Sequence, residues 1–103
     1  MEGMELTCFE IISNVGTAKS CYIDAIHKAK EGKYEKAAEL ISKGNEYYAQ
    51  GHKVHVDMIQ KEASGESLET GLLLIHAEDQ MMSAETFQVL AGEFIDLCKM
   101  MQK

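Results

Sequence analysis

The feature that most constrains the fold of this chain is that nothing interrupts three long stretches of helical periodicity. The sequence contains no proline, the residue that most reliably ends or kinks a helix. Over residues 5–31, 34–63 and 68–101, apolar side chains recur at the spacing of one helix face. We therefore expect an all-α fold, an antiparallel three-helix bundle with two short loops.

Residues that favour the ends of helices mark the two breaks between the helical stretches and the start of the first stretch. Gly32 follows the first stretch, where a glycine favours the end of a helix. Ser64-Gly65-Glu66-Ser67 forms the second break, and Ser67 is expected to cap the third helix. Thr7-Cys8-Phe9-Glu10 has the pattern of a capping box near the start of the first helix.

Helices of this length leave a surplus of apolar surface. Rods of about 27 to 34 residues are on the order of 40 to 50 Å long, whereas a compact domain of about 100 residues has a radius of gyration near 13 Å. The run from Leu72 to Met82 carries apolar side chains on more than one face, more than two neighbouring helices can cover. We expect self-association at or near this run. In the second helix, Gly44 and Gly51 are expected to allow close backbone approach.

Charge and composition argue against several classes of function. Ten lysines and no arginine face seventeen acidic residues, a formal charge of −7, so a nucleic-acid backbone would be repelled. The three cysteines are odd in number and lack CxxC spacing, which favours small core residues in a reducing compartment. No apolar run approaches the roughly 18 residues of a membrane span, and the start lacks a basic leader region. We expect a cytoplasmic protein.

His76 and Asp79 form a candidate functional pair. They stand three residues apart, so they share one helix face, on a stripe that periodicity predicts to be buried. A histidine in such a place is often a core side chain without chemistry, and that interpretation stays open. A neutral imidazole is, however, a competent nucleophile that can accept a phosphoryl group and pass it on.

The rest of the sequence suits a phosphoryl carrier better than a stand-alone catalyst. Phosphoryl transfer needs positioning and positive donors. The chain shows neither a phosphate-cradling glycine loop nor an arginine clamp. His52 and His55 could hold a metal but lack recognisable further ligands, so we expect a structural or surface role for them, and we assign no chemistry to His27.

The run Leu73-Leu74-Ile75-His76-Ala77-Glu78-Asp79-Gln80-Met81-Met82 resembles the enzyme IIA component of the lactose/cellobiose class of the bacterial sugar phosphotransferase system (PTS). Phe9-Glu10-Ile11-Ile12, Gly16-Thr17-Ala18-Lys19-Ser20 and Met58-Ile59-Gln60-Lys61-Glu62-Ala63 support the resemblance. It covers almost the whole chain, and we expect residues 1–103 to form a single domain of this family.

The resemblance implies a phosphotransferase that assembles as a homotrimer of three-helix subunits. His76 would accept phosphate from phospho-HPr as a tele-phosphohistidine and pass it to a cysteine of the cognate IIB. The membrane component IIC would then import a lactose- or cellobiose-type disaccharide. Asp79 from three subunits would meet on the threefold axis and hold one divalent cation, typically Mg²⁺.

Two positions depart from the family pattern, which often reads His-Ala-Gln-Asp-His. An ionised Glu78 aimed at His76 would repel a phosphoryl group, whereas Gln80 keeps hydrogen bonding and loses titration. Two other interpretations remain: a histidine phosphotransfer module of two-component signalling, whose histidine is typically followed by lysine and glycine in the next turn, and a non-catalytic oligomeric helical bundle with His76 buried and unreactive.

Overall fold

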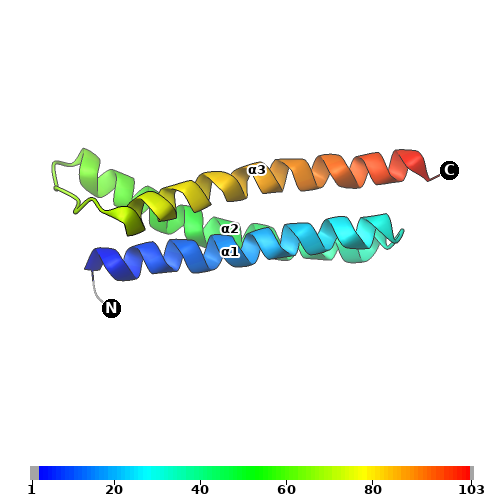
Figure 1. Cartoon of the computed structure of the whole chain (residues 1–103), viewed down its shortest axis with the longest axis horizontal. Coiled ribbons are helices and arrows are strands. Elements are labelled where there is room, and N and C mark those ends of the chain that lie inside the picture. The colour runs from blue at the N-terminus through cyan, green and yellow to red at the C-terminus, as the bar shows by residue number, and fades with distance from the viewer. Residues whose placement is uncertain (1–2, 103) are drawn as a thin grey trace.

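The protein folds into three long antiparallel helices. The computed structural model describes residues 3–102 (Figure 1). Helix α1 spans Gly3–Lys30, α2 spans Tyr34–Ala63 and α3 spans Leu72–Met101, and no strand occurs within residues 3–102. The predicted all-α three-helix fold is therefore confirmed. Met1, Glu2 and Lys103, which the predicted domain includes, lie outside the described residues.

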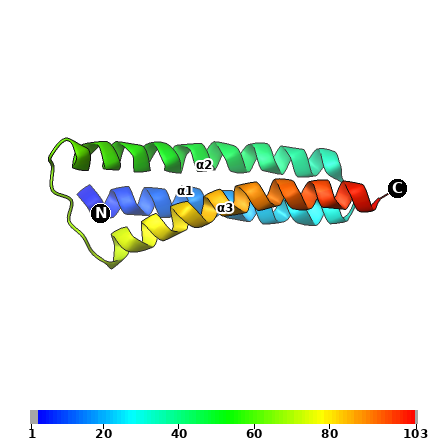
Figure 2. The same ribbon diagram turned by 90° about the horizontal axis from the view of Figure 1, so that it is seen from above.

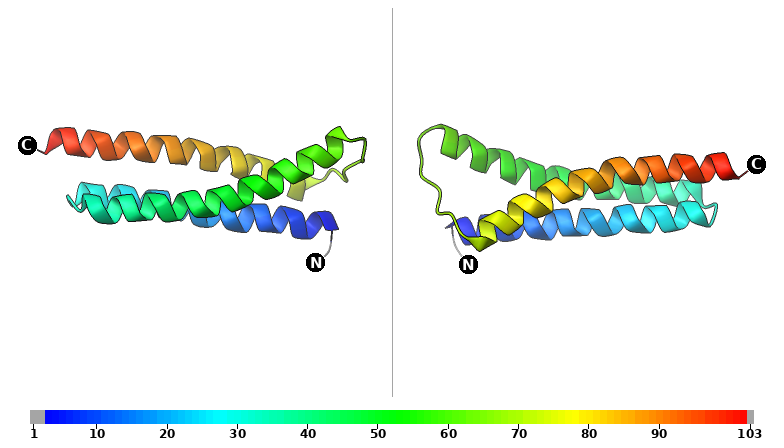
Figure 3. Two further views of the ribbon diagram at one scale, coloured as in Figure 1. Left: turned by 180° about the vertical axis from the view of Figure 1, so that it is seen from behind. Right: turned by 45° about the horizontal axis from the view of Figure 1, so that its top comes forward.

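The bundle is elongated, and α1 packs against both of the other helices. Its extents are 56 × 23 × 20 Å and its radius of gyration is 16.0 Å, above the value of about 13 Å for a compact domain of this size. Helix α1 packs extensively against both α2 and α3, whereas α2 and α3 contact each other much less. Figures 2 and 3 show α2 and α3 separating toward residues 64–71. No helix of residues 3–102 is long and apolar enough to cross a membrane.

Each loop contains a glycine with positive φ as its second residue. At the end of α1, Gly32 has φ +78°; its N–H donates to the Ala29 carbonyl at 3.0 Å, and the Lys33 N–H donates to the Lys28 carbonyl at 2.9 Å. Gly65, with φ +100°, ends α2 with the same pair of bonds. This pattern satisfies the last carbonyls of a helix and requires a left-handed residue. Both predicted breaks are confirmed.

The predicted start of α3 is wrong. The helix begins at Leu72, and its N-cap is Gly71, whose extended backbone (φ −160°) lets its carbonyl accept the Ile75 N–H at 3.1 Å. Ser67 is not the cap. Leu68 instead packs against the apolar core as part of the loop, so residues 64–71 cross between the separated ends of α2 and α3 in a non-helical path.

The predicted capping box of α1 is also wrong. Thr7 lies inside the helix, which already includes Gly3, and its Oγ1 donates to the Gly3 carbonyl at 3.1 Å. A threonine hydroxyl that bonds back to the carbonyl four residues earlier is inside a helix turn and not at its start.

The face of α1 that forms the core carries many small side chains. Its fully buried residues are Cys8, Ile11, Val15, Ala18, Tyr22, Ala25 and Ala29. The apolar residues Leu6, Phe9 and Ile23 also recur at helical spacing over residues 5–31, but they are exposed. Small residues allow the helix axes to approach closely, which the large ones would prevent.

Gly44 and Gly51 of α2 make this close approach possible. A Cβ atom at Gly44 would lie 2.7 Å from Tyr22 Cε1, and one at Gly51 would lie 2.8 Å from Val15 Cγ1. Neither position has room for a methyl group. The close backbone approach predicted for both glycines is confirmed.

Candidate active site

His76 and Asp79 lie near the start of α3 and are both exposed. Residues three apart on a helix differ by about 60° around the axis and about 4.5 Å along it, so the two side chains are neighbours. Neither side chain has a hydrogen bond or an ion pair with another residue of 3–102. Their predicted proximity is confirmed, but their predicted burial is wrong for the single chain.

His76 and Asp79 are exposed because α3 packs against α1 through a different face, on which small residues lie. Its buried face consists of Ala77, Met81, Ala84, Ala91 and Ile95. These residues let α3 approach α1, so the stripe that carries His76 and Asp79 turns toward solvent.

The exposed surface around His76 is rich in apolar side chains. Leu72 is 83% exposed and Met82 67% exposed. Further exposed apolar residues on α3 are Leu73, Ile75, Val89, Leu90, Phe94, Leu97, Met100 and Met101, and on α1 they are Leu6, Phe9 and Ile23. The predicted surplus of apolar surface is present. A surface of this kind marks an interaction site more often than a solvated face.

Lys19 of α1 reaches α3 at Gln80 and Phe87. Its Nζ donates to Oε1 of Gln80 at 3.1 Å and lies 4.8 Å from the centroid of the Phe87 ring. Gln80 follows His76 by one helical turn. Sequence reasoning noted Lys19 only as part of the family-like stretch of residues 16–20. The signal that could have found it is the absence of arginine, because any cation at the site must then be a lysine.

Glu78 faces away from His76. Residues two apart on a helix project about 200° apart, and Glu78 Oε1 lies 2.7 Å from Nε2 of His55 on α2. The His55 side chain is only 15% exposed. The pair joins α2 to α3, the two helices that pack least against each other. Glu78 therefore does not point toward a phosphoryl group on His76, and the repulsion considered from the sequence does not arise in this arrangement.

The remaining histidines and cysteines have structural surroundings. His52 stacks on the Tyr48 ring, with 5.9 Å between centroids, and His27 is exposed in the last turn of α1. The cysteines are free thiols: Cys8 and Cys21 are buried, and Cys98 is half-buried. Burial, and secondarily the charge of Glu78, raise the pKa of the Cys8 thiol. The predicted core role of the cysteines is confirmed for Cys8 and Cys21.

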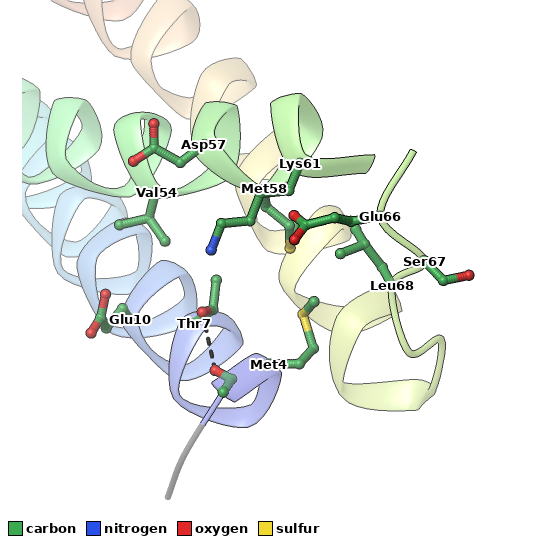
Figure 4. Close-up of a pocket in the computed structure, with 11 residues that line it drawn as sticks. Met4, Thr7, Glu10, Val54, Asp57, Met58, Lys61, Glu66, Ser67 and Leu68 are labelled. Atoms are coloured by element: carbon green, nitrogen blue, oxygen red, sulfur yellow. Dashed lines mark hydrogen bonds between the residues drawn. The ribbon is translucent and has the colours of Figure 1, made fainter. Parts of the chain in front are cut away.

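A cavity of about 440 Å³ lies away from His76, between α1, α2 and the loop (Figure 4). It is lined by Gly3, Met4, Thr7, Glu10, Val54, Asp57, Met58, Lys61, Glu66, Ser67 and Leu68. In Figure 4 the Lys61 side chain extends into it, and Thr7 turns its hydroxyl to the backbone of α1. Neither residue of the His76–Asp79 pair lines this cavity.

One chain by itself does not assemble a metal centre within residues 3–102. No group of three or more histidine, cysteine, aspartate or glutamate side chains is close enough there to hold an ion. Asp79 offers a single carboxylate on an exposed face. A cation at Asp79 would need ligands from other copies of the chain or from water.

Comparisons with known proteins agree on one family. The family model described as the PTS system, lactose/cellobiose-specific IIA subunit, matches residues 6–99. The chain is similar to the PTS oligo-beta-mannoside-specific EIIA component of Bacillus subtilis, at 40% identity over 96% of each protein.

Solved structures show the same architecture. The PTS cellobiose-specific enzyme IIA of Bacillus anthracis superposes with a TM-score of 0.94 at 40% identity, covering 99% of this chain and 94% of that one. The IIA(Chitobiose)–HPr complex of the Escherichia coli phosphotransferase system contains a chain with the same fold, with a TM-score of 0.81 at 23% identity over the full length of both.

Proposed function

The chain belongs to the lactose/cellobiose-specific IIA family of the sugar phosphotransferase system, and from this premise we propose that His76 accepts a phosphoryl group from phospho-HPr and passes it to a cysteine of the cognate IIB. The observation that carries the proposal is the exposed position of His76 within the matched residues 6–99. Membership in this family argues against a two-component signalling module. A non-catalytic bundle remains the alternative to be tested.

The chemistry requires the neutral imidazole. The Nε2 lone pair attacks phosphorus, a P–N bond forms on His76, and the bond between phosphorus and HPr breaks. In the second transfer the IIB thiolate attacks the same phosphorus, the P–N bond breaks, and His76 returns to its starting form. A protonated ring has no lone pair to donate, so acceptance falls as the pH drops through the imidazole pKa.

Exposure of His76 suits transfer between proteins. In-line displacement needs the donor and the nucleophile on opposite sides of phosphorus, so the acceptor must be reachable from outside the chain. The chain has no arginine, and a partner can supply part of the positive charge. HPr as partner is supported by the Escherichia coli complex, in which a chain of the same fold is bound to HPr.

The imported sugar is proposed to be a lactose- or cellobiose-type disaccharide. The family description names lactose and cellobiose, and the Bacillus relatives are named for oligo-beta-mannoside and cellobiose. IIA itself never contacts the sugar in this scheme, because the membrane component IIC selects it. The carrier therefore acts in the same way whichever of these sugars is imported.

We further propose a homotrimer in which Asp79 meets its two copies on the threefold axis. The exposed apolar side chains of α1 and α3 would be covered there. Three carboxylates in such an interface repel one another unless they share protons or a cation. The residues fit a hard divalent ion: Asp79 is exposed, forms no ion pair within residues 3–102 and offers oxygen ligands. A Mg²⁺ ion there would neutralise the three charges and would hold no reacting group.

Phosphoryl labelling tests the function. The parent, incubated with enzyme I, HPr and labelled phosphoenolpyruvate, should take up one acid-labile phosphate per chain. His76→Ala should take up none while keeping its helical circular dichroism. His52→Ala removes another exposed histidine and should label fully. Stoichiometric label on His76→Ala would show that the acceptor is wrong, and an unlabelled parent beside active HPr would favour the non-catalytic bundle.

A further inference from the structure

We propose that His55 of α2 and Glu78 of α3 position the nucleophile, because their contact fixes the first turns of α3, which carry His76, onto α2. Neither residue touches the reacting atoms, so both are positioning residues. The part of the inference that concerns transfer rests on the proposed function of His76. The structural part, a contact that holds the start of α3 in place, does not depend on that function.

Hydrogen bonds connect α2 with α3 at three places, about three helical turns apart along each helix. The bonded residues are Tyr34 with Cys98 at 3.3 Å, Asn45 with Gln88 at 2.9 Å, and His55 with Glu78 at 2.7 Å. Among residues 3–102, no side-chain hydrogen bond joins the two helices beyond His55 and Glu78, on the side where they separate toward the loop (Figure 3). This pair is therefore the last polar contact between α2 and α3 before residues 64–71.

The segment between the two partners has little other support. Residues 56–77 run from His55 to Glu78 through the end of α2, the loop and the start of α3. Only Met58 and Ala77 are buried in this segment, and α2 contacts α3 much less than α1 does. A segment with few buried apolar contacts opens more readily than the core, so a single hydrogen bond that closes it has a large effect on its opening.

The pair also fixes the rotation of α3 about its own axis. A carboxylate only accepts hydrogen bonds, so Nε2 of His55 carries the proton that joins the two residues. Ala77 is buried in the core, and the adjacent Glu78 is bonded to α2. Two neighbouring residues held on two sides leave the helix little freedom to turn. His76, about 200° around the helix from Glu78, is thereby directed away from α2.

Hydrogen exchange followed by mass spectrometry tests the structural part. Glu78→Ala and His55→Ala each delete the contact, and His55→Ala does so without changing the sequence of α3. Backbone amides of residues 75–80 should exchange about 3- to 10-fold faster in either variant, whereas exchange in residues 84–95 should not change. The double variant should exchange no faster than either single variant, because both substitutions remove the same contact.

Transfer from phospho-HPr tests the functional part. The maximal rate at which His76 is labelled should fall by about 3- to 10-fold in Glu78→Ala and in His55→Ala, because the imidazole spends less time in the productive position. The KM for phospho-HPr should change much less, since neither residue lies on the face of α3 that carries His76. Glu78→Gln keeps an acceptor for the Nε2 proton of His55, and it should stay close to the parent in both exchange and rate.

Gln88→Ala is the matched control. It deletes another hydrogen bond between α2 and α3, about 15 Å farther along α3 from Glu78. Asn45 still accepts a hydrogen bond from the Tyr22 hydroxyl at 2.7 Å in that variant. Gln88→Ala should therefore change neither the exchange of residues 75–80 nor the rate of labelling.

The outcomes separate the two proposals. Unchanged exchange of residues 75–80 in folded Glu78→Ala and His55→Ala, or equally faster exchange in Gln88→Ala, would overturn the contact as the one that holds the start of α3. Faster exchange with an unchanged maximal rate would overturn its role in positioning His76. A parent that takes no phosphate from active phospho-HPr would overturn the carrier function, while the exchange comparison would still decide the structural part.

Discussion

A methyl group added at Gly44 should destabilise the protein because α1 and α2 leave no room for it. The Cβ atom would lie 2.7 Å from Tyr22 Cε1, 3.0 Å from Tyr22 Cδ1 and 3.2 Å from Cys21 Cβ. Tyr22 is fully buried, and its hydroxyl donates to Asn45 Oδ1 at 2.7 Å. The ring cannot retreat without losing this bond or pushing the helices apart.

Two opposing effects set the magnitude for Gly44→Ala. Overpacking a tight core costs about 1–3 kcal/mol, whereas alanine is favoured over glycine inside a helix by about 1 kcal/mol. We expect a net loss of about 1 kcal/mol, which corresponds to a Tm lower by roughly 4–8 °C for a domain of this size.

Gly92→Ala is the matched control for this measurement. A Cβ atom at Gly92 of α3 would meet nothing within 4 Å, so only the helix preference remains and the Tm should rise. The helix preference cancels in the comparison, and the difference between the two variants isolates the overpacking energy. Thermal melts at one protein concentration measure it, since melting of an oligomer depends on concentration. Equal Tm changes in both variants would refute the close packing at Gly44.

Three further predictions concern charge. Glu78→Gln should leave the pH dependence of phosphoryl acceptance by His76 unchanged, because Glu78 faces His55; a midpoint that moves to lower pH would contradict this orientation. Asp79→Leu should stay trimeric, melt at least as high as the parent and ignore chelator, while chelator should weaken only the parent; a monomeric variant in light scattering would contradict the axial aspartate. Burial raises the pKa of Tyr22 to about 12. The contribution of the protonated phenol to the free energy of unfolding is therefore complete below the unfolded pKa near 10, and it falls by roughly 2–3 kcal/mol as the pH rises toward 12. Tyr22→Phe should flatten this alkaline loss of stability, measured by urea unfolding between pH 9 and 11.5.

The ends of α1 and α2 could be predicted because local chemistry decides them. Gly32 and Gly65 stand where the backbone needs positive φ, and a glycine after a helical stretch indicates such a place. The start of α3 could not be predicted in the same way. Leu68 is drawn onto the core from the loop, a contact between distant segments that no local pattern contains.

The buried face of α1 escaped prediction for a related reason. Helical spacing of the large apolar residues favoured Leu6, Phe9 and Ile23 together with Val15, and of these four only Val15 is buried. The observed face is selected by distance between helices: Tyr22 and Val15 fit only because Gly44 and Gly51 carry no side chain. Which residue of α1 lies opposite each glycine of α2 depends on the register between the two helices. The periodicity of one helix does not predict that register.

The candidate site was predictable only within α3. The spacing of His76 and Asp79 placed them correctly as neighbours on one face. Their exposure, the bond from Lys19 to Gln80 and the pair between His55 and Glu78 depend on how α3 sits against α1 and α2. The partners in those two contacts are 61 and 23 residues apart in the sequence.

The exposure of His76 and the exposure of the apolar side chains of α3 have one cause, which is the choice of the small face of α3 for packing against α1. The proposed carrier would present His76 to two partners in turn, so the face that carries this histidine cannot form the core of its own chain. Asp79 lies about 60° to one side of His76 around the helix and Gln80 about 40° to the other, with Lys19 on the Gln80 side. In the proposed trimer, copies that meet at Asp79 would cover one flank of the histidine and leave the Gln80 flank free. We expect phospho-HPr and IIB to approach from that flank.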